Sequence, residues 1–119
     1  MSTRQIADRL AELCRKGDFE TAQRELFADD VISIEQEASP GYEKETSGLA
    51  ANIEKGKRFE ASLEAVHGIG ISDPLVVGNV IAFTLEMDVT MKGQARSSFE
   101  ELCVYRVKDG KIISEQFFM

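Results

Sequence analysis

The feature that most constrains the fold is a change in hydrophobic periodicity at about Phe59. Before it, apolar residues recur every three or four positions over 3–15 and again from Phe19 to Phe27, which predicts two amphipathic helices separated by Gly17. After it, apolar and polar residues alternate, and this period of two predicts strands. Helices followed by a run of long strands predict an α+β fold, with the helices on one face of a curved antiparallel sheet.

One short strand and a third helix are expected before this change of period. The stretch DDVISIEQE, residues 29–37, alternates in the manner of a strand, and residues 37–48 are rich in charge, glycine and proline, which favours a mobile loop. Ser47 is suited to cap a helix that starts at Leu49 and ends at about Lys57. Turns between the later strands are expected at Asp73-Pro74, Gly78-Asn79, Lys92-Gly93 and Asp109-Gly110.

Length and charge limit the class of protein. A chain of 119 residues is about the size of one domain, so we expect a single domain over 1–119. Twenty-one acidic against fourteen basic residues give a net charge of −7, which repels phosphate backbones and anionic lipid, so we expect neither a nucleic-acid nor a membrane partner. The N-terminal sequence MSTRQIAD lacks the layout of a secretory signal, which predicts a cytoplasmic protein.

Ionisable residues recur on the apolar faces of four predicted strands. These residues, with neighbours on the same face, are Glu35 with Val31 and Ser33, His67 with Leu63, Ala65, Ile69 and Ile71, Glu101 with Phe99, Cys103 and Tyr105, and Glu115 with Ile113, Phe117 and Met119. In the strand over 80–91, the residues expected to face the helices are Ile81, Phe83, Leu85, Met87, Val89 and Met91. Because an unpaired charge is costly to bury, several such groups directed at one space predict a hydrated or ligand-filled cavity.

Each of these residues also has an ordinary structural interpretation. A single glutamate on a strand face is usually a solvated rim residue, and a lone histidine among aliphatic side chains is more often part of a hydrogen-bonded core. Cys14 and Cys103 are far apart and form no CxxC pair, so we interpret both as small buried residues in a reducing compartment. The sequence has no HxxH, HxxxH or cysteine pair, and Gly68-x-Gly70 lacks the third glycine of a dinucleotide fingerprint, so we predict no metal and no cofactor.

Two segments carry a resemblance to a known family. The stretch FADDVISIE, residues 27–35, and the hairpin VYRVKDGKI, residues 104–112, resemble the nuclear-transport-factor-like superfamily, and within it the SnoaL-like (polyketide-cyclase-like) and ketosteroid-isomerase-like branches. The resemblance implies a cone-shaped α+β barrel whose pocket lies between sheet and helices, and dimers formed through the outer face of the sheet. Aligned on Asp29-Asp30, Glu35 takes the position of the carboxylate that moves a proton in ketosteroid isomerases.

The same alignment shows a departure from those isomerases. In those isomerases a tyrosine and a protonated acid polarise the substrate carbonyl. The matching positions in this sequence are Leu10 and Cys103. Steroid isomerisation is therefore not expected, and carbonyl polarisation would have to come from Tyr105, His67 or a protonated Glu101.

Two functions remain open. The first is a cofactor-independent isomerase, cyclase or dehydratase that acts on a small, mostly apolar carbonyl compound by carboxylate acid/base chemistry. The second is a ligand-binding or dimerisation module of the same fold without chemistry. The candidate catalytic residues are Glu35, His67, Glu101 and Tyr105, and the candidate ligand-binding residues are Phe83, Met87, Phe99, Cys103, Glu115 and Phe117.

The outward faces of two strands predict a homodimer. Leu102 and Val104 share their face with Arg106, and Val80 and Ala82 share theirs with a threonine. Such a surface is too apolar for a sheet face left in water, so we expect a second copy of the chain to cover it.

Overall fold

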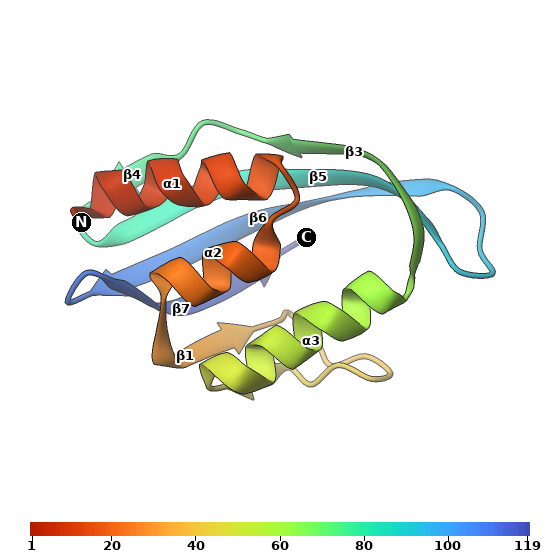
Figure 1. Ribbon diagram of the computed structural model, residues 1–119, viewed down its shortest axis with the longest axis horizontal. Coiled ribbons are helices and arrows are strands. Elements are labelled where there is room, and N and C mark those ends of the chain that lie inside the picture. Colours follow the sequence, from red (N-terminus) through yellow and green to blue (C-terminus); the bar gives the residue numbers. More distant parts are fainter.

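Three helices and seven strands form the chain in the computed structural model, which describes residues 1–119 (Figure 1). The helices are α1 (Thr3–Arg15), α2 (Phe19–Leu26) and α3 (Leu49–Ala61), and the strands are β1 (Phe27–Ile34), β2 (Glu45–Ser47), β3 (Leu63–Ile71), β4 (Leu75–Val77), β5 (Val80–Met91), β6 (Ser97–Lys108) and β7 (Lys111–Phe118). All three helices lie on one side of a curved sheet, so the predicted α+β fold is confirmed. No helix is long and apolar enough to span a membrane.

The sheet is mixed rather than purely antiparallel. Its strands follow the order β2-β1-β7-β6-β5-β3, and β4 pairs with the first residues of β5 on the same side as β3. Every pair is antiparallel except β1 with β7, which run parallel, so the expectation of an antiparallel sheet is wrong at this pair. Parallel strands need a long crossover connection, and here most of the chain, residues 35–110, lies between the two partners.

Residues at both ends of helix α1 explain where the helix begins and ends. Ser2 and Gln5 form a capping box: the Gln5 amide donates to Ser2 Oγ at 3.1 Å and the Ser2 amide donates to Gln5 Oε1 at 2.8 Å. Gly17, with a φ of 77°, takes the left-handed conformation that ends the turn into α2. The helix buries Ile6 and Leu10 completely against the sheet.

The core lies between the helices and the inner face of the sheet. In β5 the predicted alternation is confirmed, because Ile81, Phe83, Leu85, Met87 and Val89 are all buried. Cys14 and Cys103 are free and buried, as expected. Burial raises the pKa of the Cys14 thiol to about 12, so this thiol stays protonated and packs as a small apolar group.

Helix α3 differs from the prediction at both ends. It is capped by Gly48 and not by Ser47, because the φ of 94° at the cap is one that glycine adopts without strain. It continues to Ala61 instead of ending near Lys57, and Phe59 therefore belongs to the helix. The short strand β2 also occupies the end of the region expected to be loop.

Strand β7 contains an irregularity that changes which of its side chains face the core. The pairing with β6 shifts between Arg106 and Val107, so that Val107 lies opposite Ile112 and Arg106 lies opposite Ser114. Ile112 is therefore fully buried in place of the expected Ile113. Beyond this bulge the predicted alternation resumes.

Candidate functional site

Three carboxyl groups lie on the inner face of the sheet. Glu115 of β7 is directly beside Ser33 of β1 on one side and Tyr105 of β6 on the other, and all three are buried. Glu101 of β6 is two residues before Cys103, and Glu35 is two residues after Ser33, so both share this face. The strand pairing thus brings together residues from both ends of the sequence.

A lysine from α3 completes the group. Lys55 Nζ lies 2.7 Å from Glu35 Oε1 and donates a hydrogen bond to Ser33 Oγ at 3.2 Å. It also lies 5.8 Å from the centroid of the Phe117 ring, a cation–π distance. The side chains of Lys55 and Glu35 are only 13% and 29% exposed, so this ion pair is largely shielded from water.

Lys55 was not among the predicted site residues, although the sequence holds a signal for it. It follows Asn52 by three residues and precedes Phe59 by four, and both of these residues face the interior. Residues at such spacings share one face of a helix. The sequence predicts that the helix ends before Phe59, and a helix of that length does not show this inward face.

Burial controls the ionisation of two of the carboxyl groups. It raises the pKa of Glu101 to about 7, helped by repulsion from Glu35 and Glu115 and opposed by the attraction of Lys55. Burial likewise raises the pKa of Glu115 to about 7, opposed by a hydrogen bond from Ser33 and by Lys55. Near neutral pH each group therefore exchanges between a neutral form that can donate a proton and an anionic form that can accept one.

Tyr105 and Cys103 lie next to these carboxyl groups. The Tyr105 ring packs between Phe27 and Phe83, at centroid distances of 6.4 and 5.4 Å, and burial keeps the pKa of its hydroxyl well above the usual value. Cys103 Sγ lies 4.0 Å from Glu101 Oε1, and burial also raises the pKa of this thiol. Both groups remain protonated at neutral pH, so Cys103 is not an activated nucleophile.

Apolar side chains surround the carboxyl groups on the same face. Met87 of β5 pairs with Phe99 of β6, whose ring packs edge-on against Phe59 of α3 at 6.5 Å between centroids. Phe83 and Phe117 lie on either side of Cys103 in the neighbouring strands. The six predicted ligand-binding residues therefore lie on one face of the sheet, with Leu85 and Glu101 between the Met87–Phe99 pair and the other four.

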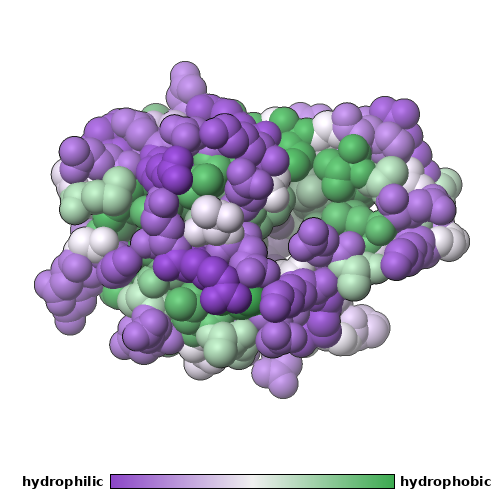
Figure 2. All heavy atoms as spheres, in the orientation of Figure 1, coloured by the Kyte–Doolittle hydropathy of each residue, from purple (hydrophilic) through white to green (hydrophobic).

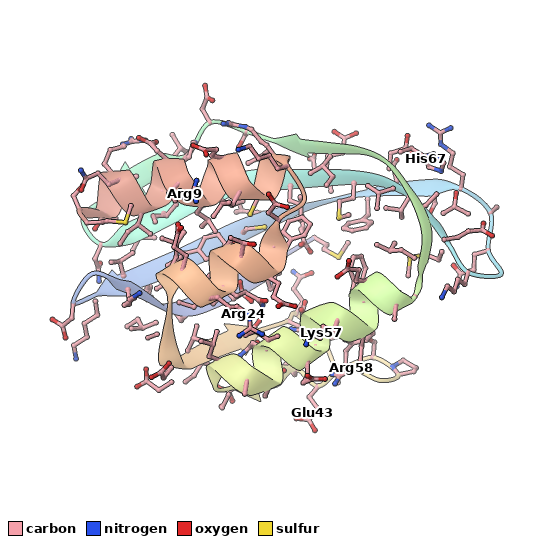
Figure 3. All side chains as sticks on the ribbon, viewed as in Figure 1. Arg9, Arg24, Glu43, Lys57, Arg58 and His67 are labelled. Carbon is pink, nitrogen blue, oxygen red and sulfur yellow. The ribbon has the colours of Figure 1, made fainter.

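His67 is the predicted site residue that lies elsewhere. It is exposed, and its Nε2 lies 2.8 Å from the hydroxyl of Thr90, a residue on the outward face of β5. Figure 3 shows His67 toward the turn between β5 and β6, away from α1 and α2. The prediction that His67 faces inward is wrong because β3 contains two bulges, one between Leu63 and Ala65 and one at His67, and each interrupts the alternation.

Comparison with known proteins shows the family of this chain. A profile of the SnoaL-like domain family matches residues 1–119. The chain belongs to the SnoaL-like family. No curated protein matches this SnoaL-like chain.

Three solved structures show the same fold. A candidate SnoaL-like polyketide cyclase from Mesorhizobium loti, also described as a carbohydrate phosphatase, is 32% identical over the whole of both chains, with a TM-score of 0.92. A protein with a cystatin-like fold from Xanthomonas campestris is 21% identical over 99% of this chain and 90% of that one, with a TM-score of 0.82. A protein of ketosteroid-isomerase-like fold from Catenulispora acidiphila, in complex with trimethylamine, is 16% identical over 96% of this chain and 84% of that one, with a TM-score of 0.75.

Two grooves lie on the surface of this SnoaL-like protein. One of about 380 Å³ lies at the edge of the sheet and is lined by Ile34, Glu35, Gln36, Glu37, Lys44, Gln116 and Phe118. The other, of about 650 Å³, lies between α1 and the loop before β4, is lined mainly by charged side chains, and contains none of the site residues. Figure 2 also shows a recess between α2 and α3, with hydrophobic side chains gathered over the sheet beside it.

Proposed function

We propose that this SnoaL-like protein binds a small, mostly apolar carbonyl compound and moves a proton within it, as a cofactor-independent isomerase, cyclase or dehydratase. Membership of the SnoaL-like family supports a small-molecule ligand. One observation carries the chemistry: Glu35, Glu101 and Glu115 share one apolar face of the sheet. Of these, Glu101 and Glu115 have pKa values raised to about 7.

Proton transfer needs an acceptor and a donor that are both available at one pH. Glu35 is the acceptor in this proposal: the bond between hydrogen and the carbon next to the carbonyl breaks, the proton goes to Glu35, and the electron pair moves to the carbonyl oxygen to form an enolate. Glu101 is the donor, because its raised pKa leaves much of it protonated near neutral pH. Its proton goes to another carbon of the enolate in an isomerase, or to a leaving hydroxyl group in a dehydratase.

The alternative is a ligand-binding module without chemistry. It is favoured by the engagement of Glu35 Oε1 with Lys55 at 2.7 Å, which occupies one oxygen of the proposed base. It is also favoured by the burial of Leu10 and Cys103, which stand at the positions of the carbonyl-polarising groups of ketosteroid isomerases and cannot replace them.

Deuterium exchange separates the two functions. The purified protein is incubated in D2O with 2-tetralone, an apolar ketone with exchangeable hydrogens, and loss of the signal of these hydrogens is followed by NMR. Glu35→Gln and Glu101→Gln should each lower the exchange rate by roughly 10²–10⁴-fold while ketone binding persists, since each removes a proton-transfer group but keeps its shape. The matched control is Glu100→Gln, an exposed outward residue next to Glu101 in β6. Binding of the ketone without exchange above the solvent background by the unmodified protein would leave the module as the function.

A further inference from the structure

Lys55 is the basic side chain that contacts the carboxyl cluster, and its ammonium group has two protein partners. An ammonium group carries three hydrogens. Two of them are directed at Glu35 Oε1, at 2.7 Å, and at Ser33 Oγ, at 3.2 Å. The side chain is only 13% exposed, and the third hydrogen is left for a ligand that binds beside Glu35. A donor held in this way is oriented in advance toward whatever binds beside Glu35.

We propose that Lys55 is a catalytic residue that binds the carbonyl oxygen of the ligand and stabilises the negative charge that forms on it. The inference rests on the proposed proton transfer and names its substrate class: compounds whose oxygen becomes an enolate or a phenolate, such as aromatic ketones and hydroxyarenes. Lys55 would thereby supply the carbonyl polarisation that Leu10 and Cys103, both buried and neither a strong donor, do not provide.

The pairing of Lys55 with Glu35 suits this reaction. In an enolisable compound the carbonyl oxygen and the transferred hydrogen are attached to neighbouring carbons, so an ammonium and a carboxylate lying side by side can engage both at once. As the proton moves to Glu35, the negative charge passes from that carboxylate to the ligand oxygen. Lys55 then has an anion beside it before and after the step, and no charge is left buried without a partner.

The competing interpretation is that Lys55 is only a counterion for Glu35. In that case a ligand would gain nothing from the lysine, and removal of Lys55 together with neutralisation of Glu35 would leave ligand binding unchanged. The two interpretations therefore differ in how the protein treats an anionic ligand compared with a neutral ligand of the same shape.

The experiment uses 4-nitrophenol, whose phenolate form absorbs visible light, and 4-nitroanisole, its neutral counterpart. Lys55→Met should weaken phenolate binding by on the order of tenfold, and the apparent pKa of the bound phenol should rise by about one unit, because the ammonium no longer stabilises the anion. Binding of the anisole should stay within about twofold. Lys57→Met is the matched control, since Lys57 lies on the same helix with a half-exposed side chain that pairs only with Glu54.

A second variant keeps the test decisive if loss of the lysine destabilises the fold. Lys55→Met combined with Glu35→Gln removes both members of the ion pair, so neither charge is left alone, and thermal unfolding verifies that the variant folds. This variant should also lack the preference for phenolate.

The outcomes distinguish this inference from the proposed function. Three results would each overturn the inference. The first is binding of the anisole by the unmodified protein as tightly as the phenolate, and the second is a preference for phenolate that Lys55→Met or the double variant keeps. The third result is exchange of deuterium into 2-tetralone by Lys55→Met at the rate of the unmodified protein. A phenolate preference that depends on Lys55, in a protein that exchanges no deuterium, would support Lys55 as the oxyanion donor and refute proton transfer.

Discussion

At the scale of single residues, Glu115 links the stability of the fold to pH. Its side chain is buried and its pKa is raised to about 7 in the folded chain, against an ordinary value of 4.5. Between pH 4.5 and about pH 7, Glu115 is therefore protonated in the folded state and ionised in the unfolded state. Stability contributed by this group is fully present below about pH 4.5 and is lost as the pH rises toward 7.

Glu115→Gln should remove this pH dependence. The amide resembles the protonated carboxyl group in shape but cannot ionise, so the variant should be more stable than the unmodified protein at pH 8 and similar to it at pH 5. The rise in pKa from 4.5 to about 7 corresponds to an upper limit of roughly 3 kcal/mol in the free energy of unfolding. Urea unfolding at pH 5 and pH 8 measures the free energy of unfolding. The control is Glu100→Gln, which changes an exposed outward residue of β6. Equal destabilisation by Glu115→Gln at both values would show that Glu115 is ionised in the folded protein.

At the scale of secondary-structure elements, the bulges of β3 decide which side of the sheet carries the histidine. Alternation places Leu63, Ile69 and Ile71 inward as expected, but the two extra residues shift the segment between them. His67 consequently reaches Thr90 on the outer surface, close to Asp88, which Arg96 holds through two hydrogen bonds of 2.9 and 2.7 Å.

His67→Ala should therefore leave the inner face undisturbed. Deuterium exchange into 2-tetralone and binding of 4-nitroanisole should both stay within about twofold of the unmodified protein, because the side chain makes its hydrogen bond on the opposite surface. A drop in exchange comparable to that of Glu101→Gln would place His67 in the chemistry after all.

Alternation of apolar and polar residues was sufficient to predict much of the fold and part of the site. It assigned the inward sets of β5 and β6, and thus the common face of Glu101, Cys103 and Tyr105, because these strands are regular over their length. It was misleading at His67 and Ile113, since a bulge depends on pairing with a distant strand and leaves little trace in the local sequence. It does not assign Lys55 to the site, because an apolar Phe59 fits both a helix and a strand and leaves the end of α3 ambiguous.

At the scale of the whole molecule, the outer face of the sheet lacks a covering layer. Leu75, Val77, Leu102 and Phe118 are all exposed large hydrophobic residues. Strand pairing places them on contiguous outward positions together with Val80, Ala82 and Val104. A protein of this size rarely leaves such a patch in water, so we continue to predict a homodimer through this face.

A charge in this patch should separate the dimer. Leu102→Glu places like charges against each other across a two-fold interface, so sedimentation velocity should show the variant as a monomer at concentrations where the unmodified chain is a dimer. Ala50→Glu introduces the same charge at an exposed position of α3 and should not change the sedimentation coefficient. An unmodified chain that sediments as a monomer at all concentrations would refute the prediction.

The parallel pairing of β1 with β7 also has a consequence for how the chain folds. Ser33 and Glu115, which are neighbours in the sheet, are separated by most of the sequence, so their contact closes a very long loop. Contacts of this kind form late and slow the folding of small proteins. During synthesis, the two helices and β1 leave the ribosome well before β7 exists, and the carboxyl cluster assembles only once the final strand has been made.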